Sequence, residues 1–309
     1  MKTLTTLLFL LISIISYGQQ KKVCFSLDDL PVVNYGVKDS TYQKNIFNKI
    51  VSSLKTNKVP AIGFVNEKKL YNKKGVIQYQ VNLLKNWSKN GLELGNHTFS
   101  HPDYNNLSLT SFTDNILKGE IITKGILKKQ GKQLKYFRHP FLHVGNTEAK
   151  ADSLNAFLNK HNYIVAPVTI DNEDYLFALA YKRANDKNDT ALMKKIGQDY
   201  IAYMEKKIKF FEMQSNKLFG RSMNQILLLH SNLLNSDYMD SLIALYKVNN
   251  YAFVSMGEAL KDEAYKTEVS VYGKWGISWI DRWALSAGKK GDFFKGDPLT
   301  PDYIKKLTK

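Results

Sequence analysis

The sequence predicts an α/β fold in which helices cover a parallel β-sheet. Three observations support this: strand-like and helix-like segments alternate, apolar residues recur at helical spacing between the strands, and no internal repeat or low-complexity linker divides the chain. With 309 residues, 44% of them hydrophobic, the chain can bury a large core. The pattern leaves open a barrel or an open doubly wound sheet. In both folds the functional groups gather beyond the carboxyl ends of the strands.

The elements follow one another in a regular order. Residues 22–29 (KVCFSLDD) form an apolar run typical of a strand, and residues 41–57 place Ile46, Ile50 and Leu54 on one face of a helix. A helix at 79–90 is ended by Gly91. The other predicted strands lie at 60–66, 92–101 (where the strand runs into a polar turn), 135–140, 163–171, 225–231 and 252–256, and the other predicted helices at 110–130, 148–160, 178–219 and 240–249.

The N-terminus has the pattern of a secretory signal peptide. Residues 1–18 contain one lysine, an apolar run over residues 7–15, and the small residues Ser16 and Gly18 before a cleavage position. The run is short for a membrane span, so we expect export to the periplasm or the extracellular space without a stable membrane anchor. Cys24 is the only cysteine and lies inside the first strand, which excludes a disulfide framework and a lipoprotein cysteine.

The formal net charge of +16 raises the question of a nucleic-acid partner. The lysines are scattered, the arginines are few, and no nucleic-acid motif accompanies them. A solvated basic surface, or attraction to an anionic cell-surface polymer, accounts for the charge. We therefore expect no nucleic-acid partner, and the sequence does not indicate the oligomeric state.

Polar residues follow five of the predicted strands and should meet at one rim of the sheet. His97 and His101 are four residues apart, a spacing that places both imidazoles on one side of a helical turn, where they can reach one metal ion. Asp28 and Asp29 end the first strand, and adjacent carboxylates need a cation or an arginine to compensate them. Neighbouring residues on an extended strand point in opposite directions, so one aspartate can bind the metal while the other stays near its water.

Five motifs, FSLDDLP, HTFSH, RHPF, DNEDY and LLLHSN, occur in this order and resemble those of the polysaccharide deacetylases, which are carbohydrate esterase family four with the NodB homology domain. The resemblance runs from Lys22 to about Leu260 and implies a distorted (β/α) barrel. It leaves a helical insertion within the barrel and a C-terminal extension after it. The expected division is a signal peptide at 1–18, the deacetylase domain at 19–260, and an extension at 261–309 that packs on the barrel.

The resemblance also implies a role for each motif residue. Asp29, His97 and His101 would bind a divalent metal, most commonly Zn²⁺, with Co²⁺, Ni²⁺ or Mn²⁺ as alternatives. Asp28 would be the general base, and Arg138 would orient it and hold it ionised. His230 would be the general acid, oriented by either Asp171 or Asp174. The N–H of Phe141, after Pro140, would stabilise the oxyanion, and Tyr175 would line the sugar site.

Some positions depart from the family pattern without removing a charged group. Leu30-Pro31 replaces a glycine after the aspartates, Phe141 replaces a tyrosine, Leu142 a glycine, and Tyr175 a tryptophan. His139 and His143 are extra histidines, which we interpret as surface or supporting residues, and His161 as a surface residue. Aromatic residues in the long helical span are expected in the core: Tyr181, Tyr200, Tyr203, Phe210 and Phe211.

The C-terminal extension contains Trp275, Trp279 and Trp283 at four-residue intervals, which predicts one helical face packed on the barrel. This segment also resembles the tail of a bacterial subgroup of these deacetylases. Together these features predict a secreted, metal-dependent enzyme that removes N-acetyl groups from an amino-sugar polymer of the chitin or peptidoglycan type. An O-acetyl esterase acting on acetylated xylan or a similar glycan is the alternative, and an inactive carbohydrate-binding relative is a third possibility.

Overall fold

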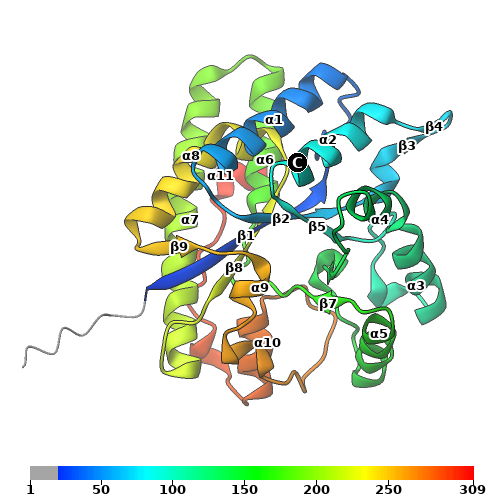
Figure 1. The fold of residues 1–309 in the computed structure, drawn as a ribbon. Helices are drawn as coiled ribbons and strands as arrows, with labels where there is room; N and C mark the ends of the chain where they lie inside the picture. Colours follow the sequence, from blue (N-terminus) through cyan, green and yellow to red (C-terminus); the bar gives the residue numbers. More distant parts are fainter. Residues whose placement is uncertain (1–19) are drawn as a thin grey trace, which may run out of the picture.

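The computed structural model describes residues 20–309, so the predicted signal peptide at 1–18 lies outside the described residues. The main sheet is parallel and has seven strands, with the order β7-β6-β5-β2-β1-β8, and β9 pairs with the start of β1 (Figure 1). These strands are β1 (Lys21–Leu30), β2 (Ala61–Val65), β5 (Glu93–Asn96), β6 (Tyr136–Phe137), β7 (Ile164–Val165), β8 (Gln225–His230) and β9 (Tyr251–Phe253). A separate two-stranded hairpin is formed by β3 (Tyr71–Asn72) and β4 (Gly75–Val76).

The sheet curves into a distorted barrel. After β7 the chain crosses to β8, where the backbone N–H groups of Thr169 and Ile170 both donate to the Ile226 carbonyl oxygen over 3.0 Å. A parallel bridge joins Ile170 to Leu227. The segment that leaves one end of the strand order therefore contacts the other end, which confirms the predicted (β/α) barrel class and decides against the open sheet.

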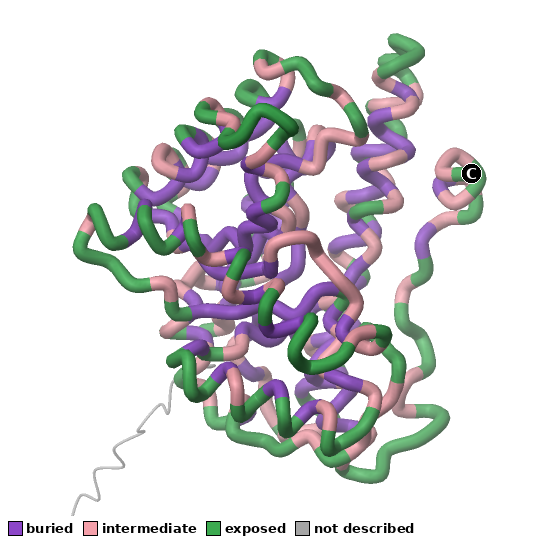
Figure 2. Tube along the Cα trace, turned by 90° about the vertical axis from the view of Figure 1, so that its right-hand side faces the viewer, coloured by how far each residue is buried: buried purple, intermediate pink, exposed green. Residues whose placement is uncertain are grey.

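Helices surround the sheet and bury one face each, as Figure 2 shows by the purple inner and green outer turns. In α1, for example, Ile46, Ile50 and Leu54 are buried, as the periodicity predicts, and Asp39 caps the helix by accepting from Thr41 N–H and Tyr42 N–H. The helices are α1 (Ser40–Thr56), α2 (Gln78–Lys89), α3 (Leu109–Lys118), α4 (Ile121–Lys128), α5 (Glu148–Lys160), α6 (Asp174–Asp186), α7 (Thr190–Phe219), α8 (Leu233–Val248), α9 (Met256–Ala259), α10 (Trp279–Ser286) and α11 (Asp302–Leu307). Short 3₁₀ turns lie at η1 (Glu67–Leu70), η2 (Tyr104–Asn106), η3 (Pro140–Leu142), η4 (Glu263–Lys266) and η5 (Gly291–Phe293).

The predicted helix at 110–130 is wrong as a single element, because it divides into α3 and α4 at Gly119. A Cβ at Gly119 would lie 2.3 Å from the carbonyl carbon of Thr98, so only glycine allows this close approach. The carboxylate of Glu67, which is fully buried, starts α4 by accepting from Ile122 N–H over 3.1 Å and from Thr123 N–H over 2.6 Å. The break therefore supports the loop that carries the two histidines.

The long helical span also divides into two helices, α6 and α7, and Asp189 caps the second by accepting from Leu192 N–H over 2.9 Å. The five aromatic residues predicted for the core of this region are all buried. Their rings contact other aromatic rings: the Phe177 ring lies 5.0 Å from the Tyr203 ring, and the Tyr181 ring lies 6.0 Å from the Tyr238 ring of α8. The structure therefore places them in the core and not in a sugar groove.

The C-terminal segment after α9 lies along the barrel, beside α7 in Figure 1. The prediction of one helical face with three tryptophans is wrong for Trp275, which precedes α10 and is 42% exposed. Trp279 and Trp283 are buried in the core, and the Trp279 N–H donates to the Val168 carbonyl oxygen over 2.7 Å. Within residues 20–309, none of the helices has the length and apolar composition needed to cross a bilayer.

Candidate metal centre and active site

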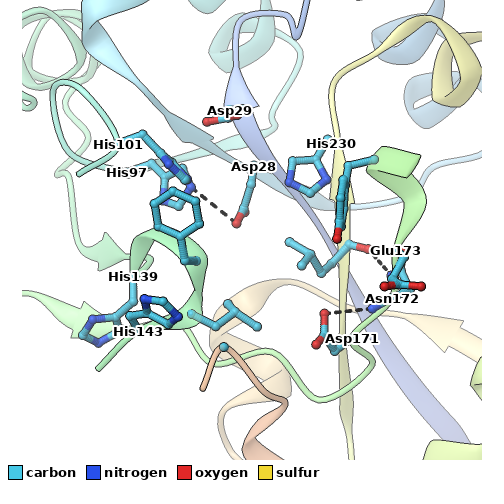
Figure 3. A pocket seen from close by; sticks show the side chains of 15 residues that line it. Asp28, Asp29, His97, His101, His139, His143, Asp171, Asn172, Glu173 and His230 are labelled. Carbon is cyan, nitrogen blue, oxygen red and sulfur yellow. Dashed lines mark hydrogen bonds and ion pairs between the residues drawn. The ribbon is translucent and has the colours of Figure 1, made fainter. Parts of the chain in front are cut away.

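Six of the polar residues predicted at the strand ends line one cavity of about 530 Å³ at the carboxyl edge of the barrel (Figure 3), whereas Arg138 and Asp174 do not line it. Asp28 at the end of β1 is directly opposite His230 at the end of β8 in the parallel register. The loops after β5, β6 and β7 form much of the remaining wall. The residues that line it are Asp28, Asp29, His97, His101, His139, Phe141, Leu142, His143, Asp171, Asn172, Glu173, Tyr175, Leu228, Gly276 and His230.

Both aspartates of β1 line this cavity, which a regular strand would not allow. The register between β1 and β2 shifts between Leu27 and Leu30, and Asp29 has a left-handed backbone with φ of 64°. Aspartate is one of the few residues that tolerate this conformation. The prediction of an extended backbone with the two side chains on opposite faces is therefore wrong at Asp29, because the bulge turns it to the same side.

His97 and His101 come together through a loop, so the predicted helical turn is wrong. Thr98 and His101 have positive φ values of 67° and 56°. Asn96 Oδ1 accepts from Thr98 N–H over 2.7 Å, and Thr98 Oγ1 accepts from His101 N–H over 3.0 Å, which fixes this tight turn. The two rings lie 4.8 Å apart at 74°. The spacing thus identifies a true neighbour pair, although its backbone is not helical.

Asp29, His97 and His101 offer one ligand atom each, and these atoms lie within 4.8 Å of one another. The His97 Nδ1 atom is 2.9 Å from the Arg138 carbonyl oxygen, which leaves Nε2 directed at the cavity, where it is 3.6 Å from Asp28 Oδ2. Asp29 Oδ1 is buried and has no hydrogen-bond partner among the described residues. Two imidazoles and an unsatisfied carboxylate oxygen are a donor set that fits a zinc-like divalent cation.

The ionisation states also suit a metal. Burial lowers the pKa of His97 and of His101 to about 4, so both imidazoles are neutral near pH 7. Burial opposes the ionisation of Asp29, but the Lys69 ammonium and the two histidines hold its pKa below the usual range. Lys69 Nζ lies 3.6 Å from Asp29 Oδ2 and donates to the Asp29 carbonyl oxygen over 2.7 Å. Lys69 is a contact that the sequence patterns did not indicate.

Asp28 lies between the histidine pair and His230. Its Oδ1 is 3.9 Å from Arg138 Nε, and the fully buried arginine also donates from Nη2 to Ser26 Oγ over 2.8 Å. The Arg138 guanidinium lies 4.7 Å from the centre of the Phe64 ring. Burial raises the pKa of Asp28, and the positive charge of Arg138 offsets only part of that effect. A buried carboxylate with a raised pKa has the properties of a general base.

The structure decides between the two aspartates proposed to orient His230. Asp174, which is fully buried, places Oδ1 2.7 Å from His230 Nδ1, and its Oδ2 accepts from the His230 N–H over 2.9 Å. Burial alone would lower the pKa of His230, but the Asp174 carboxylate raises it to about 9. Asp171 instead accepts from the Asn172 N–H over 2.8 Å, and burial raises its pKa to about 7.

The loop after β6 forms the wall opposite Tyr175. Pro140 is buried, while Phe141 has a φ of 57° and is 52% exposed, with its ring 4.4 Å from the His101 ring. The Tyr175 ring is 49% exposed and lies 6.5 Å from the ring of His230. These two exposed aromatic side chains flank the mouth of the cavity and provide surfaces on which a sugar can pack.

Two contributors from the C-terminal segment were missed by sequence reasoning. Gly276 lines the cavity, and a Cβ there would lie 2.1 Å from the Phe141 carbonyl oxygen. Arg282, which is fully buried, donates from Nη2 to the Leu142 carbonyl oxygen over 2.7 Å. No local motif marks either residue, because both act through contacts with residues about 140 positions earlier.

The extra histidines have different surroundings. His139 is buried and lines the cavity, and burial lowers its pKa to about 3, so the interpretation as a surface residue is wrong for it. His143 supports the loop, with Nδ1 2.7 Å from Asp103 Oδ1. His161 is exposed at the end of α5, as predicted.

Residues 16–158 match the polysaccharide deacetylase family. The peptidoglycan deacetylase PdaC from Bacillus subtilis is 22% identical, with a TM-score of 0.50 over 79% of this chain and 93% of that chain. The chitin deacetylase from Colletotrichum lindemuthianum is 22% identical, with a TM-score of 0.51 over 79% of this chain and 90% of that chain.

A mutant of a Bacillus anthracis pseudoenzyme of carbohydrate esterase family four, with restored enzymatic activity, is 15% identical, with a TM-score of 0.50 over 79% of this chain and 69% of that chain. No curated protein matches the chain. At these identities the structural similarities concern the fold. The match over residues 16–158 covers just under half of the chain, and the distorted barrel is the fold that the chain shares with these structures, so the chain is similar to the polysaccharide deacetylases in sequence over that range and in fold.

Proposed function

We propose that the protein is an exported, metal-dependent deacetylase that hydrolyses N-acetyl groups of an amino-sugar polymer of the chitin or peptidoglycan type. The observation that carries this proposal is the position of Asp28 and His230. They are paired in register on β1 and β8, beside the cluster of Asp29, His97 and His101. A base and an acid beside a metal-binding cluster are what the hydrolysis of an unactivated amide requires.

A divalent cation, Zn²⁺ by preference, would be held by Asp29, His97 and His101, and when bound it acidifies water and polarises an acetyl carbonyl. Asp28 would accept the proton of the attacking water, because its raised pKa makes it a stronger base than an exposed aspartate. Arg138 would keep that carboxylate in place. The N–H of Phe141, preceded by Pro140, would donate to the oxyanion, and Tyr175 would pack against the sugar.

His230 would supply the proton to the departing nitrogen. With a pKa of about 9, its imidazole carries that proton at neutral pH, and Asp174 fixes the ring orientation through Nδ1. An amine anion is a poor leaving group, so an amide substrate needs this acid more than an ester substrate does. This difference favours N-acetyl over O-acetyl hydrolysis. The O-acetyl esterase remains the second candidate, because the same cluster can serve both reactions.

We assign residues 1–18 to an export signal, residues 19–260 to the deacetylase domain, and residues 261–309 to an extension that completes the site wall through Gly276 and Arg282. The substrate would then be met in the periplasm or outside the cell. One of the similar structures is that of a pseudoenzyme, which raises the alternative of an inactive carbohydrate-binding protein. The presence of Asp28, Arg138 and His230 in one site argues for catalysis.

Acetate release tests this proposal. The mature protein is assayed on N-acetylglucosamine oligomers and on O-acetylated xylan, before and after chelation and after zinc restoration. We expect zinc-dependent release from the N-acetylated oligomers that is lost in Asp29→Ala and kept in Asp292→Ala, a matched exposed aspartate. Acetate release from the ester alone would support the O-acetyl esterase and contradict the N-deacetylase. Glycan binding without acetate release from either substrate would identify a binding protein.

A further inference from the structure

A second cavity, of about 650 Å³, lies on the other side of Asp29 from the proposed reaction centre. Its size is within the range of about 300–1,000 Å³ that is typical of ligand sites. Asp29 lines both cavities, so the two are contiguous at the proposed metal ligand. The walls come from the loop after β1, from η1, and from the β3–β4 hairpin, which extends past α2 in Figure 1.

The aromatic residues of this cavity suit a sugar ring. Tyr35, Tyr71 and Tyr79 line it, and all three are partly exposed. Tyr35 has a left-handed backbone with φ of 47°, and its hydroxyl donates to the Tyr175 carbonyl oxygen over 3.5 Å. This contact joins the loop of the second cavity to the aromatic residue at the mouth of the first. Tyrosines offer both an apolar face and a hydroxyl, which is what a pyranose requires.

One buried side-chain amide of this cavity has a hydrogen-bond acceptor without a donor. Gln80 lines it, is 5% exposed, and donates from Nε2 to Gln43 Oε1 over 2.5 Å. Its Oε1 atom has no donor among the described residues. A buried acceptor without a partner is costly unless a ligand or a water supplies the donor. Sugar hydroxyl groups are such donors.

The charge of this cavity differs from that of the first. Lys38 and Lys69 line it, and Lys44 packs over the Tyr79 ring at 5.6 Å. Within residues 20–309, Asp29 is the sole carboxylate that lines it, and Lys69 already pairs with Asp29. Asp39, the neighbour of Lys38, uses its carboxylate to cap α1. Lys38 is therefore a cation with no acidic partner in the cavity, whereas the first cavity contains four carboxylates, namely Asp28, Asp29, Asp171 and Glu173.

We propose that this second cavity is a subsite for a sugar that carries a carboxylate and lies next to the acetylated sugar in the same glycan, with Lys38 recognising the carboxylate and Tyr79 contacting the ring. This inference rests on the proposed function and deepens it, because it favours a glycan with alternating neutral and anionic sugars over a neutral homopolymer. The family match says nothing of this selectivity.

The test is a binding measurement, so that it does not depend on turnover. Calorimetry measures the binding of two tetrasaccharides to the mature protein in the presence of chelator. In the first, N-acetylglucosamine alternates with a sugar that carries a lactyl-ether carboxylate. The second is identical, except that its carboxylates are converted to methyl amides. We expect the carboxylate form to bind about threefold to fivefold more tightly, as one partly exposed ion pair allows. At about 1 M salt, where the Debye length is about 3 Å, this preference should disappear.

Variants locate the effect. Lys38→Gln should abolish the preference for the carboxylate form, whereas Lys73→Gln, at a lysine of the β3–β4 turn that does not line the cavity, should keep it. Tyr79→Ala should weaken both forms to the same degree. Equal binding of the two tetrasaccharides by the unaltered protein, or an equal loss in the two lysine variants, would overturn the proposal. Acetate release is measured separately, so the binding preference can be interpreted even if the proposed deacetylase activity is absent.

Discussion

Replacement of Asp174 by asparagine tests the contact between Asp174 and His230, which Asp171 does not make. In the folded protein, Asp174 receives bonds from the His230 N–H and from Asn235 Nδ2, at 2.9 and 2.7 Å, and its other oxygen lies 2.7 Å from His230 Nδ1. Asparagine is nearly isosteric but removes the negative charge. The burial of His230 remains, and burial lowers the pKa of an imidazole.

The magnitude follows from the pKa of His230, which is about 9 instead of 6.5. At 1.36 kcal/mol per unit, this difference is worth about 3 kcal/mol of favourable interaction with the protonated ring. A raised histidine pKa stabilises the fold fully below pH 6.5, and the contribution is lost as the pH rises through about 9. We therefore expect Asp174→Asn to cost about 3–5 kcal/mol at pH 6, as for other broken buried pairs. The cost should be smaller at pH 9.5.

Titration of the His230 ring protons by NMR measures this directly, with the metal-free forms compared. The pKa of His230 should fall to 6.5 or lower in Asp174→Asn, and in the proposed mechanism acetate release at pH 7.5 should fall at least about tenfold, with the alkaline limb of the pH–rate profile displaced to lower pH. Asp171→Asn is the control, because it removes a carboxylate from the cavity that His230 lines without touching the His230 contacts. An unchanged His230 pKa in Asp174→Asn, or a large shift in Asp171→Asn, would refute this reasoning.

Three further predictions concern the metal, the C-terminal segment and the histidine loop. Zinc at about 100 times its dissociation constant should stabilise the protein by about 2.7 kcal/mol, measurable as a higher Tm. Asp29→Asn should lose this effect, while Asp103→Asn, whose partner is His143, should keep it. Trp283→Ala should lower the free energy of unfolding, measured with denaturant, by about 3–5 kcal/mol, because the side chain is 2% exposed. Trp275→Ala, at an exposed tryptophan, should lower it by less than about 0.5 kcal/mol. Equal losses in the two variants would contradict the packing of this segment. Glu67→Ala should lower stability by about 1–2 kcal/mol through the lost cap of α4, whereas Glu205→Ala, on the exposed side of α7, should leave it nearly unchanged.

The sequence predicted the sheet and the gathering of polar residues because both depend on local patterns. Alternating elements require parallel strands, and parallel strands bring their carboxyl ends to one edge. Asp28 and His230 are therefore opposite each other although 202 positions separate them along the chain. The position of these two residues depends only on the order of strands and helices, which the hydrophobic pattern of the sequence predicts.

The errors concern features that depend on backbone conformation or distant contacts. The left-handed residues Asp29, Thr98 and His101 are not glycines, so no residue type announces the bulge or the tight turn. The break at Gly119 follows from contact with Thr98, and the position of Gly276 from contact with Phe141. A spacing of three between Asp171 and Asp174 cannot show which carboxylate reaches His230, because the end of β7 and the start of α6 decide it.

The support of the cavity wall by the C-terminal segment has a consequence for biosynthesis. Asp28 and His97 are synthesised first, His230 follows more than 130 positions after His97, and Gly276 and Arg282 are added later still. Arg282 Nη2 donates to the Leu142 carbonyl oxygen, and the backbone N–H of Trp279 donates to that of Val168, so two loops of the site depend on residues that are synthesised long after them. Contacts of such long sequence separation form slowly in folding. A nascent chain that ends before His230 therefore lacks the proposed acid, and one that ends before Arg282 lacks the finished wall, so translation must pass Arg282 before the assembled site can exist.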